Sequence, residues 1–295
     1  DALSDIAEGE TVKSDGGQGE GTVVGVFRLP TDLGAAFDRA LYEEAAVGPF
    51  EAWTGHTPPP PYPSRTSGSD LDLVLTSGQI RVGRSDDVAF PAYEQTMCAG
   101  AVARIKAHYV LSTLNPVTVS LSGVNKFSAL LAALSNGDAD VVVSDAYTDF
   151  GRLRLAPMGR PYAVSALGAV GQPAVAALAA PSDLDAESLK VVVAIGSDGE
   201  QYADEVLSKS QIVRVNTFDE QMASMSTMQV DVAIADLRRL QSTTSPVLSA
   251  PLTLPWRTHL AAVLPLRADF KCAVRVHVST PFAYTDAGKP LLKGG

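Results

Sequence analysis

The segment IGSDGEQYADEVL, residues 195–207, places small and acidic residues where an apolar strand turns into a helix. Gly196, Ser197 and Asp198 fall at this turn, where backbone N–H groups and the helix dipole favour an anion such as a carboxylate or a phosphate. The same residues fit a capping box, because Ser197 and Glu200 are three positions apart and can satisfy each other's backbone donors. The two roles are compatible, so the segment predicts a helix start and a candidate anion site.

An internal echo points to a second set of candidate residues. Residues 130–145 (LLAALSNGDADVVVSD) and 221–236 (QMASMSTMQVDVAIAD) share the order helix, short turn, Asp, apolar strand, Asp. Their final residues are Asp145 and Asp236, and open parallel sheets bind ligands just outside the carboxyl ends of their strands. The echo therefore predicts two similar halves, each with an acidic side chain at a strand end.

Arginine follows the first of these strands. The stretch AYTDFGRLR places Arg152 and Arg154 shortly after Asp145, and a guanidinium can hold a carboxylate through two parallel hydrogen bonds. Two other interpretations stay open. An arginine is commonly a solvated surface charge, and the nearby Asp145 would neutralise Arg152 if the two formed an internal salt bridge.

Other chemistries lack their residues. The turn near Gly196 has neither G-x-G-x-x-G nor GxxxxGK[ST], and no serine lies in G-x-S-x-G, so no dinucleotide, NTP or nucleophilic serine is indicated. Cys98 and Cys272 lie far apart without zinc-ligand spacing, and the four histidines form no HExxH pattern, so we expect no metal and no cofactor. A single disulfide and two separate thiols are both compatible with this cysteine usage, and we favour the thiols.

Charge and hydropathy exclude further classes of partner. The formal net charge of −10 repels phosphate backbones, so nucleic acid is not an expected partner. The longest apolar runs fall well short of the roughly 20 residues that span a bilayer, so we expect no transmembrane segment. A start at Asp1 fits a mature chain whose targeting segment has been removed, and an exported, periplasmic or organellar location is the leading expectation.

The elements that must position these residues read as an α/β protein. From residue 71 to residue 236, helices alternate with short strands rich in β-branched residues, which is typical of parallel sheets. The segment before them comprises an acidic, Gly-rich terminus (1–20), a strand (21–29), an amphipathic helix (31–48) that begins at Thr31 or Asp32 and stops at Gly48, and a Pro-rich linker (55–70).

Taken in order, these motifs resemble type II periplasmic solute-binding proteins of the polar amino-acid-binding type. LDLVLTSGQIRVGRSDD resembles the opening helix and first strand of that family, and FSALLAALSNGDADVVVSDAYTDFGR resembles its helix, strand and carboxylate-binding arginine. LKVVVAIGSDGEQYADEVL and VDVAIAD resemble its second lobe. The resemblance covers about residues 71–270, and the first seventy residues have no counterpart in it.

This resemblance implies a two-lobed α/β fold, each lobe a mostly parallel sheet flanked by helices, with an N-terminal extension. It places residues 1–70 in the extension, 71–165 with 259–295 in lobe 1, and 166–258 in lobe 2, with crossings near 163–170 and 257–264. It implies transport-type binding of a small amino acid or carboxylate between the lobes. By resemblance, Arg152 holds the α-carboxylate, Ser197 and Asp198 form the second-lobe turn, and Asp236 pairs with the α-amino group.

The chain also departs from the family. Val88 takes the place of an aromatic residue that usually stacks on the ligand, and Asp145 stands where small residues are common. Tyr93, at the strand-proximal position, and Asp145 are further candidate ligand-binding residues. The same superfamily includes cyclohexadienyl dehydratase, which aromatises prephenate or arogenate, and the general acid of that enzyme falls on Glu200. Binding is favoured over catalysis, and the dehydratase is the alternative.

A third interpretation makes the fold a non-catalytic scaffold. In the helix at 31–48, an apolar stripe runs along one face, formed by Leu33, Phe37, Leu41 and Tyr42. Such a stripe docks either onto a protein partner or back onto the lobes. The N-terminal extension is therefore a candidate partner-binding segment.

Overall fold

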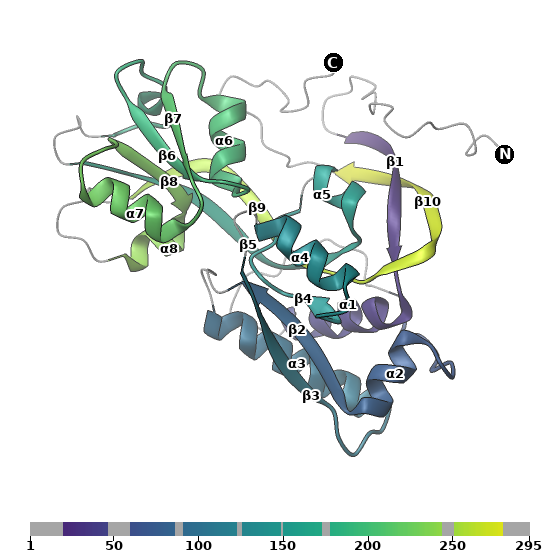
Figure 1. Ribbon diagram of the computed structural model, residues 1–295. Helices are drawn as coiled ribbons and strands as arrows, with labels where there is room; N and C mark the ends of the chain where they lie inside the picture. Colours follow the sequence, from purple (N-terminus) through teal and green to yellow (C-terminus); the bar gives the residue numbers. More distant parts are fainter. Residues whose placement is uncertain are drawn as a thin grey trace.

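The computed structural model describes residues 20–46, 60–85, 91–122, 126–148, 150–172, 178–243 and 251–279. Its main feature is a mixed sheet with the strand order β3-β2-β4-β9-β5-β8-β6-β7, seen across the centre of Figure 1. The strands are β2 (Gln79–Ser85), β3 (Asn115–Leu121), β4 (Val141–Val142), β5 (Met158–Gly171), β6 (Lys190–Ala194), β7 (Gln211–Val215), β8 (Val232–Asp236) and β9 (Leu252–Val263).

The sheet consists of two halves with matching order. In the first half β2 is parallel to β3 and β4, and in the second half β6 is parallel to β7 and β8. The long strands β5 and β9 are antiparallel to each other and lie between the halves, β9 beside β4 and β5 beside β8. The predicted two-lobed α/β fold is therefore confirmed, and β5 and β9 join the lobes.

Helices cover both faces of each half. They are α2 (Asp70–Ser77), α3 (Pro91–His108), α4 (Lys126–Ser135) and α5 (Phe150–Leu155) in the first half, and the 3-10 helix η1 (Pro181–Leu184), α6 (Asp198–Val206), α7 (Phe218–Ser226) and α8 (Leu237–Ser242) in the second. Strand β6 illustrates how both faces are covered. Val191 and Val193 pack with Tyr202 of α6, whereas Val192 packs with Phe218 of α7. A strand buried on both faces is typical of parallel sheets.

Local hydrogen bonds begin two of the second-half helices. Ser197 is the N-cap of α6 and accepts from the N–H of Glu200 at 3.1 Å, and Thr217 caps α7 in the same way through Glu220. In each case the glutamate carboxylate accepts a backbone N–H from just before the helix. The predicted N-cap at Ser197 is therefore confirmed, and the glutamate accepts the N–H of the residue before the cap.

The N-terminal segment contributes to the first half. Strand β1 (Glu20–Pro30) pairs antiparallel with β10 (Leu266–Ser279), and these two strands lie side by side in Figure 1. Helix α1 (Asp32–Ala45) begins at Thr31, whose hydroxyl accepts from the N–H of Gly34. Leu33, Phe37 and Leu41 are buried in the same core cluster as residues of α3 and β5. The apolar stripe that was a candidate partner surface therefore packs on the first lobe.

Polar contacts fasten this segment further. Asp38 of α1 accepts from both the backbone N–H and the guanidinium of Arg160 on β5, each at 2.6 Å. Tyr62, in the described part of the Pro-rich stretch, stacks on His108 of α3 with ring centroids 4.1 Å apart. Residues 60–70, expected to form a linker, thus contact the first lobe. Residues 1–19 and Gly48 lie outside the described residues.

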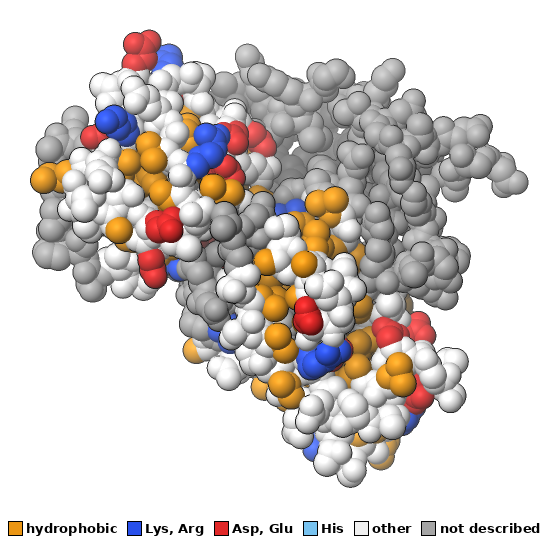
Figure 2. All heavy atoms as spheres, in the orientation of Figure 1, with side chains coloured by type: hydrophobic (Ala, Val, Ile, Leu, Met, Phe, Trp, Pro, Cys, Tyr) orange, Lys and Arg blue, Asp and Glu red, His pale blue; other side chains and the backbone are white. Residues whose placement is uncertain are grey.

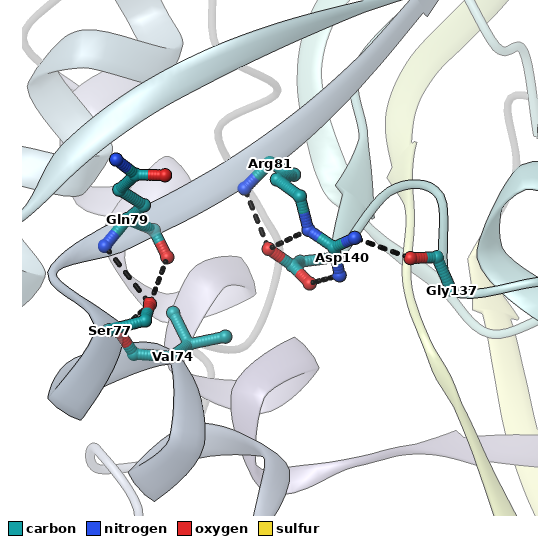
Figure 3. A network of polar contacts seen from close by, with 6 residues as sticks. All are labelled: Val74, Ser77, Gln79, Arg81, Gly137 and Asp140. Carbon is teal, nitrogen blue, oxygen red and sulfur yellow. Dashed lines mark hydrogen bonds and ion pairs between the residues drawn. The ribbon is translucent and has the colours of Figure 1, made fainter.

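An ion pair connects the end of α4 to the sheet. The guanidinium of Arg81 on β2 binds both carboxylate oxygens of Asp140, at 2.6 and 3.3 Å, and donates to the carbonyl of Gly137 at 2.5 Å, as Figure 3 shows. Asp140 also accepts the backbone N–H of Arg81, so it holds β4 in register beside β2. On the described part of the face in Figure 2, acidic and basic side chains are scattered over both halves.

Candidate functional site

A cavity of about 100 Å³ lies between the two halves of the sheet. Its walls come mainly from the segments that follow β4, β6 and β8, at the carboxyl ends of these strands, and residues of α4, α7 and β9 complete them. Open α/β sheets bind ligands at this edge, because several loops and helix starts converge there. Among the residues predicted from the sequence, the lining includes Asp145, Arg152, Ser197, Asp198 and Asp236.

Arg152 extends from α5 in the first half and is buried. Its guanidinium carbon lies 3.5 Å from the centroid of the Tyr147 ring and 4.4 Å from that of Phe127. The side chain donates to the Tyr147 carbonyl at 3.2 Å and, across the cavity, to the Gly196 carbonyl at 2.7 Å. Aromatic faces attract a guanidinium and keep its plane fixed. Arg152 is therefore a positioned cation that also connects the two halves.

The turn between β6 and α6 forms the opposite wall. Gly196 has a φ of +72°, and Ser197 and Asp198 follow it at the start of α6. Glu200 lies behind this turn: it accepts the N–H of Gly196 at 2.7 Å and pairs with the guanidinium of Arg214 at 2.8 Å. Glu200 is not part of the described cavity lining. The dehydratase alternative therefore lacks its assigned general acid at the cavity wall.

Asp236 ends β8 and lines the second half of the cavity. One carboxylate oxygen accepts the backbone N–H groups of Arg238 and Arg239, and the other accepts the hydroxyl of Ser165 on β5. Burial raises the pKa of Asp236 to about 7, and the negative charge of Asp198 acts in the same direction. The carboxyl can therefore gain or lose a proton near neutral pH, and a nearby cation would favour its ionised form.

In the second half, two polar lining residues escaped the sequence analysis. Arg239 places its guanidinium 4.1 Å from the ring centroid of Phe218, and burial lowers its pKa to about 10. Gln221 of α7 is fully buried and donates to the carbonyls of Val192 and Ile234, both at 2.8 Å. The signal for Arg239 was its place three residues after the strand-ending Asp236, which mirrors Arg152 after β4. Gln221 carried no signal, because a glutamine inside a helix is ordinary.

The remaining candidates lie elsewhere. Tyr93 of α3 is half-buried against the first-lobe core, outside the described lining, and donates to the carbonyl of Tyr162 at 3.3 Å. Cys98, also on α3, is a buried free thiol. Val88 lies outside the described residues, as does the side chain of Arg154. The described first-lobe residues that reach the cavity thus come from α4 and from the segment after β4, and not from α3.

Two further features of the described residues bear on the kind of site. Within the described ranges, His, Cys, Asp and Glu side chains do not gather in any group of three or more that could hold a metal ion. Of the helices that the structure describes, none combines the length and the apolar character needed to cross a membrane. The lining is instead a mixture of carboxylates, guanidinium groups and aromatic rings, which suits a small polar organic ligand.

Comparisons with known proteins agree with this architecture. No family model and no curated protein sequence matches the chain. Solved structures do match. One is an ancestral amino acid-binding protein, a precursor of cyclohexadienyl dehydratase, with a TM-score of 0.57 and 18% identity over 68% of this chain and 87% of that one.

Two further structures come from named bacteria. A putative binding component of an ABC transporter from Wolinella succinogenes, complexed with lysine, has a TM-score of 0.55 and 16% identity over 65% of this chain and 84% of that one. A cysteine-binding protein from Campylobacter jejuni has a TM-score of 0.53 and 15% identity over 66% of this chain and 80% of that one. The chain therefore has the two-lobed fold of the type II periplasmic amino-acid-binding proteins.

Proposed function

We propose that this protein binds a small amino acid or carboxylate in the cavity between its lobes. The observation that carries the proposal is the convergence of Arg152 from the first half with Ser197, Asp198 and Asp236 from the second half on one cavity. The similar structures are described as binding lysine or cysteine, or as amino acid-binding. An exported or periplasmic location is part of the same proposal.

Arg152 is the group proposed for the ligand carboxylate. Its guanidinium lies over the rings of Tyr147 and Phe127 and donates to the carbonyl of Gly196. A carboxylate that takes over this donor would gain a charge-assisted hydrogen bond in place of one to a neutral carbonyl. Binding would then exchange a contact between the lobes for a contact through the ligand.

The acidic side chains are proposed to hold an amine. The described lining has three carboxyl groups, on Asp145, Asp198 and Asp236, and two guanidinium groups, on Arg152 and Arg239. A ligand that brings an ammonium group as well as a carboxylate can form charge-assisted hydrogen bonds with both kinds of group. A zwitterionic amino acid meets both requirements, and a cavity of about 100 Å³ suits a small one.

Lobe closure is the motion that would enclose such a ligand. Strands β5 and β9 are paired across the junction, and their register shifts at several places between Met158 and Gly168. Such irregularities are places where a strand pair bends. Hinge closure around a ligand would therefore be carried by β5 and β9, with the lobes moving as units.

The test is ligand binding by wild-type protein and by Arg152→Ala. A thermal-shift screen of the common L-amino acids and prephenate identifies ligands, since a compound that binds only the folded state raises the melting temperature. Calorimetry should then show Arg152→Ala weakening the best ligand by about 30-fold or more, from the loss of about 2 kcal/mol or more when one member of a buried charge pair is truncated.

Arg65→Ala is the matched control. Arg65 is an exposed arginine of the first lobe that binds Asp72 and Thr76, and it does not line the cavity. It should leave the affinity unchanged. Equal affinities of the Arg152→Ala variant and the wild type would refute the assignment of Arg152.

A further inference from the structure

A buried glutamate lies directly behind the cavity. Glu94 is on α3 and its side chain is completely inaccessible to solvent. Its Oε1 accepts the backbone N–H of Asp145 at 2.7 Å and the hydroxyl of Tyr162 at 2.5 Å. Among the described residues, no hydrogen-bond partner is present for its buried Oε2. Burying a carboxyl oxygen without a hydrogen bond lowers the stability of the folded state, so we expect this arrangement to have a functional reason.

Asp145 connects this glutamate to the cavity. Asp145 lines the cavity and adopts a φ of +48°, the left-handed region that non-glycine residues rarely occupy. Such a conformation costs on the order of 1–2 kcal/mol and persists only when neighbouring contacts hold it. The hydrogen bond from the Asp145 N–H to Glu94 is such a contact. Glu94 therefore acts as a positioning residue for Asp145.

The two carboxyl groups are also coupled electrostatically. Burial raises the pKa of Glu94 to about 8, and the negative charge of Asp145 acts in the same direction. The pair therefore retains one proton at neutral pH, as like charges at close range demand.

Other titratable groups face this pair from the surrounding elements. Tyr162 on β5 donates to Glu94. The charge of Glu94 contributes to the raised pKa values of the Cys98 thiol and the Tyr93 phenol, both on α3. The positive charge of Arg84 on β2 acts in the opposite direction on the pKa of the Cys98 thiol and lowers it. On the cavity side, the charge of Asp145 contributes to the raised pKa of Asp236. Among the described residues, no cation is a cause of the shift in the pKa of Glu94.

We propose that Glu94 and Asp145 share one proton in the free protein, and that an ammonium group binding at Asp145 expels this proton. The inference rests on the proposed function and specifies its ligand class: a molecule that carries a cationic amine. The proton leaves the Glu94 carboxyl for solvent, the pair gains a second negative charge, and the ammonium group compensates it. No other bond forms or breaks.

The ligand-independent test is the protonation of Glu94 itself. Infrared spectra of the ligand-free protein should show a protonated carboxyl band at pH 7 that disappears with a midpoint near pH 8. Glu94→Gln should lose this band. Asp236→Asn should retain it and lose only the absorption that titrates near pH 7, which the Asp236 carboxyl contributes. Asp145→Asn should lower the midpoint, because it removes the neighbouring charge. A wild-type spectrum at pH 5–7 without a Glu94-dependent band would overturn the shared proton.

The ligand-dependent test counts protons. The probe is whichever of the common L-amino acids gives the largest thermal shift, and calorimetry at pH 7 in phosphate and in Tris buffer measures the protons released. A nearby cation lowers a carboxyl pKa by roughly 1–3 units, so the wild type should release about half to one proton. Glu94→Gln should release measurably fewer, because a glutamine has no proton to lose.

The ammonium-coupled proton release and the proposed function can be refuted separately. If an amino acid binds and Glu94→Gln releases as many protons as the wild type, the ammonium-coupled release is wrong while the proposed function stands. If the Glu94-dependent band is present and no amino acid binds, the proposed function fails and the ammonium assignment fails with it. The amine-free analogue of the best ligand should release no proton, and release with this analogue would contradict recognition of the amine.

Discussion

Helix α1 should be as important to stability as the helices that follow it. Leu41 is 1% exposed and lies in the core cluster that includes α3 and β5. Leu41→Ala removes buried methyl groups and leaves a cavity, which typically costs about 3–5 kcal/mol. With an m-value of about 3 kcal/mol/M, a loss of 3 kcal/mol lowers the midpoint of urea unfolding by about 1 M. Circular dichroism during urea titration measures this shift.

Leu73→Ala is the matched control for this experiment. Leu73 lies on α2 and is 63% exposed, so the same substitution there should change the unfolding free energy by no more than about 0.5 kcal/mol. Equal midpoints for Leu41→Ala and Leu73→Ala would refute the reasoning. The result would mean that α1 is an appendage, and the N-terminal segment would again be a candidate for binding a partner.

Two further predictions concern the site. In Gly199→Ala, the added Cβ would meet the backbone carbonyl oxygen of Ile234 at 2.7 Å, so thermal unfolding should show a loss of about 1–3 kcal/mol; an unchanged melting temperature would contradict this close packing. The pKa of Glu94 is raised from 4.5 to about 8 by burial and then by Asp145. The folded state therefore binds more protons than the unfolded state between these values, and the stabilisation is complete below pH 4.5 and lost as the pH rises to 8. Urea unfolding from pH 5 to pH 8 should show a downward slope that Glu94→Gln reduces by up to about 1.4 kcal/mol per pH unit; equal slopes would show that Glu94 does not retain its proton.

The elements that sequence analysis predicted correctly are those with a local cause. Strand β6 reads as KVVVA and α6 begins with Ser197 three residues before Glu200, so a buried strand and a capped helix follow from neighbouring residues alone. The echo between 130–145 and 221–236 predicted two similar halves in the same way. The structure has α4 and β4 in the first segment and α7 and β8 in the second. Asp145 and Asp236 at their ends line one cavity.

The strands that join the lobes were beyond such reasoning. Strand β5 contains Pro161 and several alanines and glycines, and its apolar residues do not alternate. It is a strand because it pairs with β9, where for example Ala163 faces Leu260, a residue distant in the chain. Pairing of this kind depends on the folded topology, which local propensity does not encode.

The sequence by itself determined the alternation of helices and strands, the helix caps and the acidic strand ends, because these depend on residues within a few positions of one another. Only the tertiary structure decided which surface the apolar stripe of α1 covers and which side chains share the cavity with Arg152. Glu94 shows the difference most clearly. In the sequence it is an ordinary acid near the start of a helix, and it is buried because α3 packs against Tyr162 of β5 and the end of β4. Its role follows from neighbours 51 and 68 residues away, Asp145 and Tyr162, and only folding brings them together.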